Sequence, residues 1–154
     1  MTPMAIETMP IDQLQPYARN ARTHSRKQIG QIARSIERFG FTNPVLISDD
    51  NEIIAGHGRV EAARHLGWRT VPTLRLSQLG RAERRAYVLA DNKLAQNAGW
   101  DRELLALELQ GLIDLKFEVE LTGFSLAEID LVRGCPSSAT KKLRPQATER
   151  APTA

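Results

Sequence analysis

The sequence predicts an α+β fold for this chain of 154 residues, and three observations carry that prediction. Apolar residues recur at helical spacing after Ser25, two short stretches rich in branched apolar residues follow, and helical patterns return after Arg81. Hydrophobic residues make up 42% of the chain, which is enough for one compact core. We therefore expect a small core that combines strands with flanking helices, followed by a helical lobe.

The first helix is expected between Ser25 and Gly40. Ser25 and Gln28 have the Ser-x-x-Gln form of a capping box, and Gly40 is a residue that commonly ends a helix. Residues at i, i+3, i+4 and i+7 form the predicted inward face, namely Ile29, Ile32, Ala33, Ile36 and Phe39.

Two strands are expected next, as a hairpin. The stretches VLIS, residues 45–48, and EIIA, residues 52–55, flank a polar turn of two Asp and one Asn. Residues 71–76, VPTLRL, predict a further strand, in which Pro72 favours an edge or strand-start position.

Helices are expected in the rest of the chain. One runs from about Arg59 to Leu66 and ends at Gly67. The next runs from Arg81 toward Asn97, and its inward residues are expected to be Tyr87, Leu89, Ala90 and Leu94.

Two more helix starts are predicted by their capping residues. Asp101 is the expected N-cap of a helix through Leu115, and the capping box at residues 125–128 begins a short last helix. After Arg133 the apolar period is lost, so residues 134–154 are expected to be disordered. The predicted parts are therefore a domain at 1–98, a helical connector lobe at 99–133 and a basic tail at 134–154.

Charge is unevenly distributed along these parts. Residues 1–98 carry 14 basic and 9 acidic side chains, residues 99–133 carry 3 and 8, and residues 134–154 carry 4 and 1. A basic front favours contact with phosphates. The acidic segment is either a surface for a partner or a solvated helix face.

Other features exclude whole classes of protein. No stretch approaches the roughly 18 consecutive apolar residues of a membrane span, and residues 1–11 lack the pattern of a secretory signal. We therefore expect a cytoplasmic protein with no membrane partner. Cys135 is the single cysteine, which excludes an internal disulfide and a thiolate metal site.

The stretch IIAGHGRVEAARHLG contains the first candidate site. Its Gly56-His57-Gly58 corner leads from a strand into a helix, whose first N–H groups are unpaired and carry partial positive charge. Arg59 adds a planar donor that suits a phosphate. The corner is either a phosphate cradle or a simple turn, and His57 is either an acid or base or a hydrogen-bonded turn residue.

Two further patches are polar. Asp91 and Asn92 interrupt a helical pattern, where they either bring oxygen atoms to Mg²⁺ or form a solvent-facing pair. The stretch YARNARTH places Arg19, Asn20, Arg22 and His24 in a loop that is either functional or merely solvated.

Together, in this order, the patches carry a family resemblance. The stretches PYARNARTH, IARSIERFGFTNPVLI, IIAGHGRVEAARHLG and ADNKLAQN resemble the ParB N-terminal domain of the ParB/sulfiredoxin-like, or ParB-like nuclease, superfamily. The resemblance covers residues 6–97. It implies a small mixed-sheet core with flanking helices, and a nucleotide with Mg²⁺ as cofactor, either CTP or ATP/ADP.

The resemblance also implies roles for individual residues. A Gly-x-x-x-Pro element at Gly40 to Pro44, which includes Asn43, helps to hold the base. The phosphate-binding box matches at Gly56, Arg59 and Ala62, and the last box matches at Asn92, with Asp91 as a chemically similar substitute. The residues expected to bind nucleotide and phosphate are Gly40, Asn43, Pro44, Gly56, His57, Gly58, Arg59, Arg22 and Asn92. Mg²⁺ is expected at Asp91 and Asn92, and catalysis at His57. The residues expected to contact DNA are Arg19, Arg22, Arg81, Arg84 and Arg85.

The sequence departs from the family pattern at four functional positions. His57 replaces a Glu, Gly58 and Glu61 replace Arg residues of the phosphate box, and Ala95 replaces the Arg of the last box. These replacements weaken the expectation of CTP hydrolysis, and sulfiredoxin chemistry lacks its cysteine at His57. The Gly-His-x-Arg form is more similar to members of this fold in phages and mobile elements, often joined to a DNA methyltransferase.

Segment 99–133 resembles the connector that precedes the methyltransferase in such proteins. We expect the chain to stop before that catalytic domain, and also before the helix-turn-helix that gives partitioning proteins their sequence specificity. Three functions stay open. The preferred one is an accessory module that binds nucleotide and DNA in phage or mobile-element DNA modification or maintenance. The second is a Mg²⁺-dependent hydrolase, either nuclease or nucleoside triphosphatase, with His57 as acid or base. The third is an adaptor whose acidic lobe docks a separate DNA methyltransferase, and a homodimer is a further expected assembly.

Overall fold

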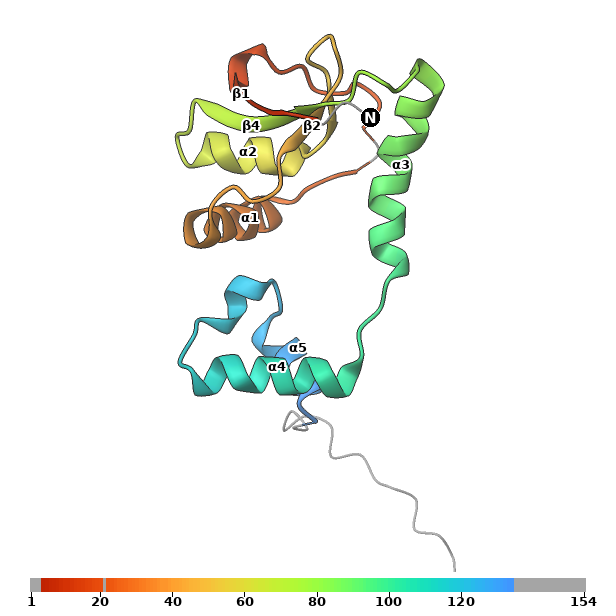
Figure 1. Ribbon diagram of the computed structural model, residues 1–154. Helices are drawn as coiled ribbons and strands as arrows, with labels where there is room; N and C mark the ends of the chain where they lie inside the picture. Colours follow the sequence, from red (N-terminus) through yellow and green to blue (C-terminus); the bar gives the residue numbers. More distant parts are fainter. Residues whose placement is uncertain (1–3, 21, 135–154) are drawn as a thin grey trace, which may run out of the picture. The chain divides into compact units, whose positions relative to one another are not determined.

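The computed structural model describes residues 4–20 and 22–134 (Figure 1). The chain divides into two compact units, Met1–Trp100 with Leu121–Gly123 and Asp101–Glu120 with Phe124–Ala154. The predicted domain limits at 98 and 133 stay a prediction. Of the tail expected to be disordered, residues 135–154 lie outside the described part, and so does Cys135.

Strands and helices are mixed along the chain, which confirms the α+β prediction. In chain order the elements are β1 (Ile6–Pro10), η1 (Ile11–Gln13), α1 (Arg26–Phe39), β2 (Val45–Ile47), β3 (Ile53–Ala55), α2 (His57–His65), β4 (Thr70–Arg75), α3 (Arg81–Asn97), α4 (Arg102–Asp114), η2 (Val119–Thr122) and α5 (Leu126–Val132). No helix in the described part of the chain combines the length and the apolar character that crossing a membrane requires.

The first unit is built on a four-stranded mixed sheet in the order β1-β4-β2-β3. β2 and β3 form the predicted antiparallel hairpin, β1 and β4 pair antiparallel, and β2 and β4 pair parallel. β1 was not foreseen, and it makes β4 as a whole an inner strand. Pro72 itself has a partner only in β1, so the predicted edge or strand-start position agrees with its place in the sheet. Pro72 is tolerated because β4 pairs with β2 only from Thr73 onward, so no β2 ladder bond is lost.

Two helices cover one face of this sheet in successive layers (Figure 1). α2 lies against the sheet, where Val60 and Ala63 are buried with Val45, Ile47 and Val71. α1 lies against α2, and Ala33 and Ile36 pack on Ala62.

The predicted capping residues of α1 are confirmed, whereas one residue of its predicted inward face is exposed. Ser25 Oγ accepts the Gln28 N–H at 3.1 Å, and Gly40 follows the helix at φ +86°. Phe39, expected to face inward, is 52% exposed.

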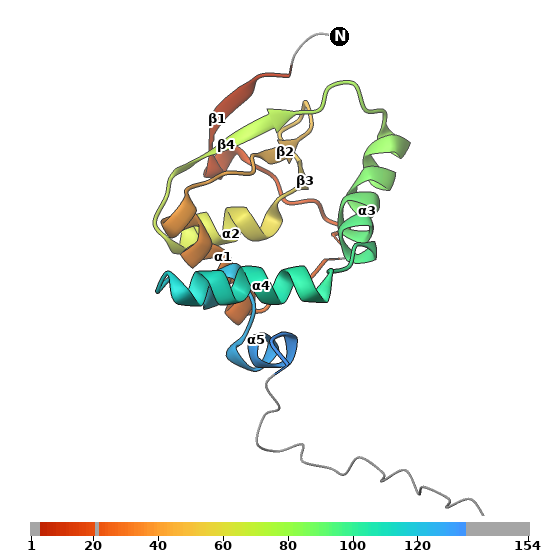
Figure 2. The same cartoon turned by 60° about the horizontal axis from the view of Figure 1, so that its bottom comes forward.

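α3 lies beside β3 and buries only part of its length (Figure 2). Val88 packs with Ile54 and Leu76, and Tyr87 lies against them. The predicted inward positions Leu89 and Leu94 are wrong, since their side chains are 61% and 68% exposed. Tyr87 faces inward as predicted, but the buried residue of α3 is Val88, which was not among the predicted positions.

The second unit has its own small apolar cluster. Leu109, Val119 and Ile129 are buried in it. Its helix starts are as predicted: Asp101 Oδ1 accepts the Leu104 N–H at 3.1 Å, and Ser125 N donates to Glu128 Oε2 at 2.7 Å in a reciprocal capping box.

Candidate functional site

The candidate site begins at the junction of β3 and α2. α2 starts at His57, two residues before the predicted start at Arg59, and Val60 N donates the first helical bond, to Gly56 O at 3.0 Å. The N–H groups of His57, Gly58 and Arg59 therefore have no acceptor within their own helix. They leave partial positive charge at the carboxyl end of β3.

Gly56 is needed at this junction for two reasons. Its backbone is left-handed, with φ +106°, which side chains other than glycine rarely adopt. A Cβ there would also lie 2.9 Å from Arg59 Nη2 and 3.2 Å from Arg59 Cζ. The guanidinium of Arg59 therefore lies directly over Gly56, and only a bare backbone leaves it room.

The Arg59 side chain is held by few bonds for a charge that is largely removed from water. Nη2 donates to Pro44 O at 3.2 Å, while Nε is buried without a hydrogen-bond partner. Burial lowers the pKa of Arg59, and the nearby Asp91 carboxylate opposes that shift. Arginine stays charged in proteins, so this guanidinium keeps unused hydrogen-bond donors, and an anion beside it would stabilise its charge.

His57 points its ring at the segment before α1. Tyr17 N donates to His57 Nε2 at 3.1 Å, so Nε2 holds a lone pair and the proton of the neutral ring is on Nδ1. Burial lowers the pKa of His57 from 6.5, and His24 lowers it further, while Glu61 opposes this. Burial thus favours the neutral ring, and protonation at Nε2 would break the bond from Tyr17 N.

Asp91 and Asn92 of α3 line the same small cavity as the start of α2. Its volume is about 110 Å³, and the other lining residues include Asn20, Arg22, His24, Gly56, His57, Gly58 and Arg59. Tyr87 Oη donates to Asp91 Oδ1 at 3.5 Å, and Asn92 Nδ2 donates to Val88 O at 2.9 Å. Asn92 therefore keeps its carboxamide oxygen and one N–H for a ligand or a water molecule.

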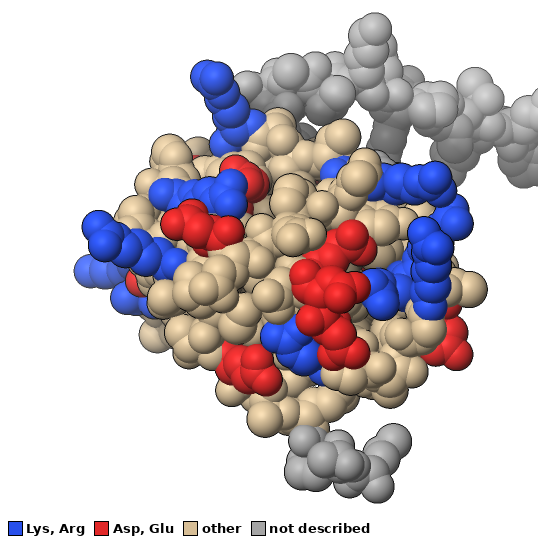
Figure 3. Space-filling model, turned by 90° about the horizontal axis from the view of Figure 1, so that it is seen from above, with Lys and Arg blue, Asp and Glu red and all other residues tan. Residues whose placement is uncertain are grey.

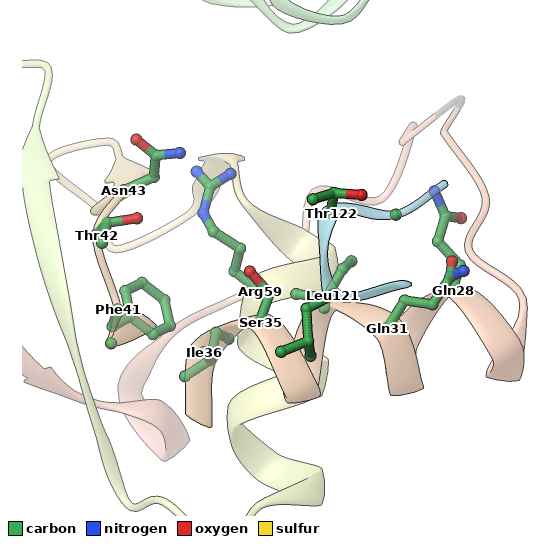
Figure 4. A pocket seen from close by; sticks show the side chains of 13 residues that line it. Gln28, Gln31, Ser35, Ile36, Phe41, Thr42, Asn43, Arg59, Leu121 and Thr122 are labelled. Atoms are coloured by element: carbon green, nitrogen blue, oxygen red, sulfur yellow. The ribbon is translucent and has the colours of Figure 1, made fainter. Parts of the chain in front are cut away.

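A second pocket adjoins the first through Arg59, which lines both. Figure 4 shows Thr42 and Asn43 on one side of the Arg59 side chain and Gln28 and Gln31 on the other. Gly40 lines it as well, whereas Pro44 contributes the carbonyl oxygen bound by Arg59.

Three polar residues that α1 contributes to this pocket were not predicted as site residues. Gln28, Gln31 and Ser35 of α1 all line it. They recur at i, i+3 and i+7, so they form a polar stripe beside the apolar face of α1. That spacing was the signal that could have identified them.

The arginines expected to bind DNA separate into two groups. Arg19, Arg81, Arg84 and Arg85 line one pocket of about 580 Å³, together with Asp50 and Glu52. Arg22 instead lines the cavity at α2. On the face shown in Figure 3, Lys and Arg side chains form separate groups with Asp and Glu between them, so that face is not uniformly basic.

Few of the described side chains are placed to bind the Mg²⁺ ion that was expected from the sequence. Among residues 4–20 and 22–134, no group of three or more His, Cys, Asp or Glu side chains is placed to hold a metal ion. A cation at Asp91 and Asn92 would therefore need most of its ligands from water and from a bound phosphate, as Mg²⁺ commonly does.

Because Gly56 is needed both for its left-handed backbone and for the space beside Arg59, adding a single methyl group there should destabilise the protein. Gly56→Ala should lower the free energy of unfolding by about 1–3 kcal/mol, because it strains the backbone and displaces the Arg59 guanidinium. Gly30→Ala is the matched control: nothing lies within 4 Å of its added Cβ, in the interior of α1. It should stabilise the protein by up to about 1 kcal/mol in the same urea titration. Equal effects of the two variants would contradict this account of Gly56.

The neutral ring of His57 predicts a loss of stability in acid. Its pKa in the folded state is lowered, so below about pH 6.5 the unfolded chain binds more protons and the free energy of unfolding falls with falling pH. His57→Gln keeps an acceptor for Tyr17 N–H but does not titrate. Between about pH 7 and pH 5, its stability should fall less steeply than that of the wild type, by at most about 1.4 kcal/mol per pH unit. Parallel pH profiles in chemical denaturation would refute the assignment.

Comparison with known proteins gives matches over both units. The family model of the ParB N-terminal domain matches residues 2–93, and that of the ParB-methyltransferase HTH domain matches residues 103–150. The second match corrects the expectation that the chain stops before a helix-turn-helix. In the described part of that match the chain forms α4 and α5.

A curated protein and two solved structures are also similar to this chain. The ParB-like nuclease domain-containing protein YnaK of Escherichia coli (strain K12) is 57% identical over 70 residues, 46% of this chain and 80% of the relative. C-terminally truncated chromosome-partitioning protein ParB from Caulobacter crescentus, complexed with CTP-γ-S, aligns with a TM-score of 0.60 and 23% identity over 84% of this chain and 71% of that chain.

A Pnob8-like ParB-N domain aligns with a TM-score of 0.51 and 17% identity over 79% of this chain and 49% of that chain. At these identities the two solved structures establish the fold. The family model covers more than half of the chain, and the curated relative is matched over most of its length. This chain therefore belongs to the ParB N-terminal domain family.

Proposed function

We propose that this chain binds a nucleotide, with its phosphates at the start of α2, and acts as a DNA-binding accessory module. The observation that carries the proposal is the Arg59 guanidinium, which lies over Gly56 with Nε buried and without a partner. A phosphate beside it would accept from Arg59 and from the free N–H groups of α2. Charge-assisted bonds of this kind are about twice as strong as neutral ones.

The two pockets suit different parts of a nucleotide. The cavity at α2, about 110 Å³, has room for phosphate groups only, because pockets for whole small ligands begin at roughly 300 Å³. The base and ribose would therefore lie in the second pocket, along Gly40, Asn43 and the polar stripe of α1. Arg59 joins the two and would bridge phosphate and sugar.

CTP is the first nucleotide to test, since the ParB structure from Caulobacter crescentus carries a CTP analogue. Mg²⁺ would accompany it. Asp91 and Asn92 would contact the ion through its water shell, consistent with a single carboxylate and a single carboxamide oxygen at that place. When bound, the ion would neutralise phosphate charge.

DNA contact is proposed for the first unit. Arg19, Arg81, Arg84 and Arg85 surround one pocket, separate from the cavity at α2, and could meet successive backbone phosphates. The second unit matches a ParB-methyltransferase HTH domain, yet residues 99–133 carry 3 basic and 8 acidic side chains. That charge favours a protein partner for its described part. A DNA methyltransferase in phage or mobile-element DNA modification is the partner we propose.

Hydrolysis is the alternative function, and the name of the curated relative, a nuclease domain protein, favours it. The acid or base expected for it is His57. Its Nε2 already accepts a bond from Tyr17, and its Nδ1 carries the proton of the neutral ring. Binding without turnover is therefore the preferred proposal.

The nucleotide site is tested by removing its guanidinium. In calorimetry with CTP, ATP, ADP and GTP, with and without Mg²⁺, Arg59→Ala should weaken binding of the preferred nucleotide by about tenfold or more, because it removes a charge-assisted bond. Arg64→Ala is the matched control. Arg64 lies on the same helix, but it is exposed and pairs with Glu61 at 3.4 Å, so its removal should leave affinity unchanged.

The same samples separate binding from catalysis. Phosphate release with Mg²⁺ should stay at background for the wild type. Release that His57→Gln abolishes would establish the hydrolase instead. Equal affinity of Arg59→Ala and wild type would reject the phosphate site itself.

A further inference from the structure

Gly58, the second residue of α2, is required for space and not for its backbone. Its φ is outside the left-handed region that Gly56 adopts. A Cβ on Gly58 would lie 3.0 Å from both Cε1 and Nε2 of His24, and 3.1 Å from Ile32 Cδ1. The missing side chain therefore lets the imidazole of His24 come against the first turn of α2.

The His24 ring is fixed in one orientation by α1. Its Nδ1 pairs with Gln28 Oε1 at 3.2 Å, and an amide oxygen only accepts, so Nδ1 is the donor. This leaves Nε2 on the side of Gly58, in a residue that lines the cavity at α2. Gln28 in turn lines the second pocket, so the pair spans both parts of the proposed nucleotide site.

The two imidazoles that line this cavity therefore differ in whether Nε2 is available to a ligand. His57 uses Nε2 to accept the Tyr17 N–H, and a proton there would break that bond. His24 has Nε2 available, and protonation would turn it into a charged donor without disturbing Gln28. Arg22, His57 and Arg59 also line the cavity and add positive charge or donors, while Asp91 is its carboxylate.

We propose that His24 is a further phosphate-binding residue, whose Nε2 supplies the donor that Gly58, having no side chain, cannot supply. The proposal rests on the phosphate site at α2 and deepens it. The ligand group is a phosphate that carries at least two negative charges, as in a nucleoside triphosphate. His24 contacts it from a segment outside the helix, and a bound phosphate would stabilise the protonated ring.

Inorganic triphosphate is the probe, because it has the charge of the ligand but no base. His24→Ala should weaken its binding in calorimetry by about tenfold or more, the range of one charge-assisted hydrogen bond. His65→Ala, an exposed histidine at the other end of α2, should bind as the wild type does. Unchanged affinity of His24→Ala, with Arg59→Ala impaired, would overturn the role of His24 and leave the phosphate site intact.

Gly58→Ala provides the second variant, because it displaces the ring without removing it. It should lose about as much affinity as His24→Ala, and the double variant should lose no more than either single one. Additive losses would contradict the proposal. The midpoint of thermal unfolding without triphosphate reports any damage to the fold separately from binding.

Proton uptake on binding distinguishes a phosphate contact from a structural role. Calorimetry in two buffers of different ionisation enthalpy should show that proton uptake on binding triphosphate at one pH is greater for the wild type than for His24→Ala. Equal uptake in both proteins would overturn the proposal. If the wild type binds no triphosphate at all, the phosphate site at α2 fails, and the role of His24 fails with it.

Discussion

The structure of this site depends on one constraint, the placement of the Arg59 charge over the bare backbone of Gly56. The left-handed Gly56 turns the chain from β3 into α2 and leaves room for the guanidinium. Pro44 O holds one end of that group, while burial lowers the Arg59 pKa and Nε stays unsatisfied. A buried charge with unused donors is costly unless it is paired, and this cost is the physical basis of the anion site that we propose.

Local chemistry explains why much of the fold was predictable. Ser25, Asp101 and Ser125 each accept the bond that a capping residue is expected to accept, and the β2–β3 hairpin follows from its apolar stretches. Long-range pairing was not predictable in this way. β1 has an exposed pattern and is defined by its pairing with β4, so the inner position of β4 could not be predicted from its own sequence.

The candidate site was predictable in part. The Gly56 to Arg59 junction has a local signature, and the structure places Asp91 and Asn92 against the same cavity. What Arg59 and His57 bind could not be predicted, because Pro44 and Tyr17 are distant in sequence from them. His24 was visible only as part of a polar loop. Its proposed role rests on its contact with Gly58, where no Cβ fills the space beside the ring. That contact is seen in the structure and could not be predicted from the spacing of residues in the sequence.

The central claim is that phosphates lie where the N–H groups of α2 and the Arg59 guanidinium converge. Its most direct measurement is an NMR titration that follows the backbone amides of His57, Gly58 and Arg59 together with the Arg59 Nε–H. The account predicts that CTP and inorganic triphosphate both shift these four resonances, whereas cytidine, which has no phosphate, leaves the three backbone amides in place. Binding of CTP that leaves all four unmoved would contradict it.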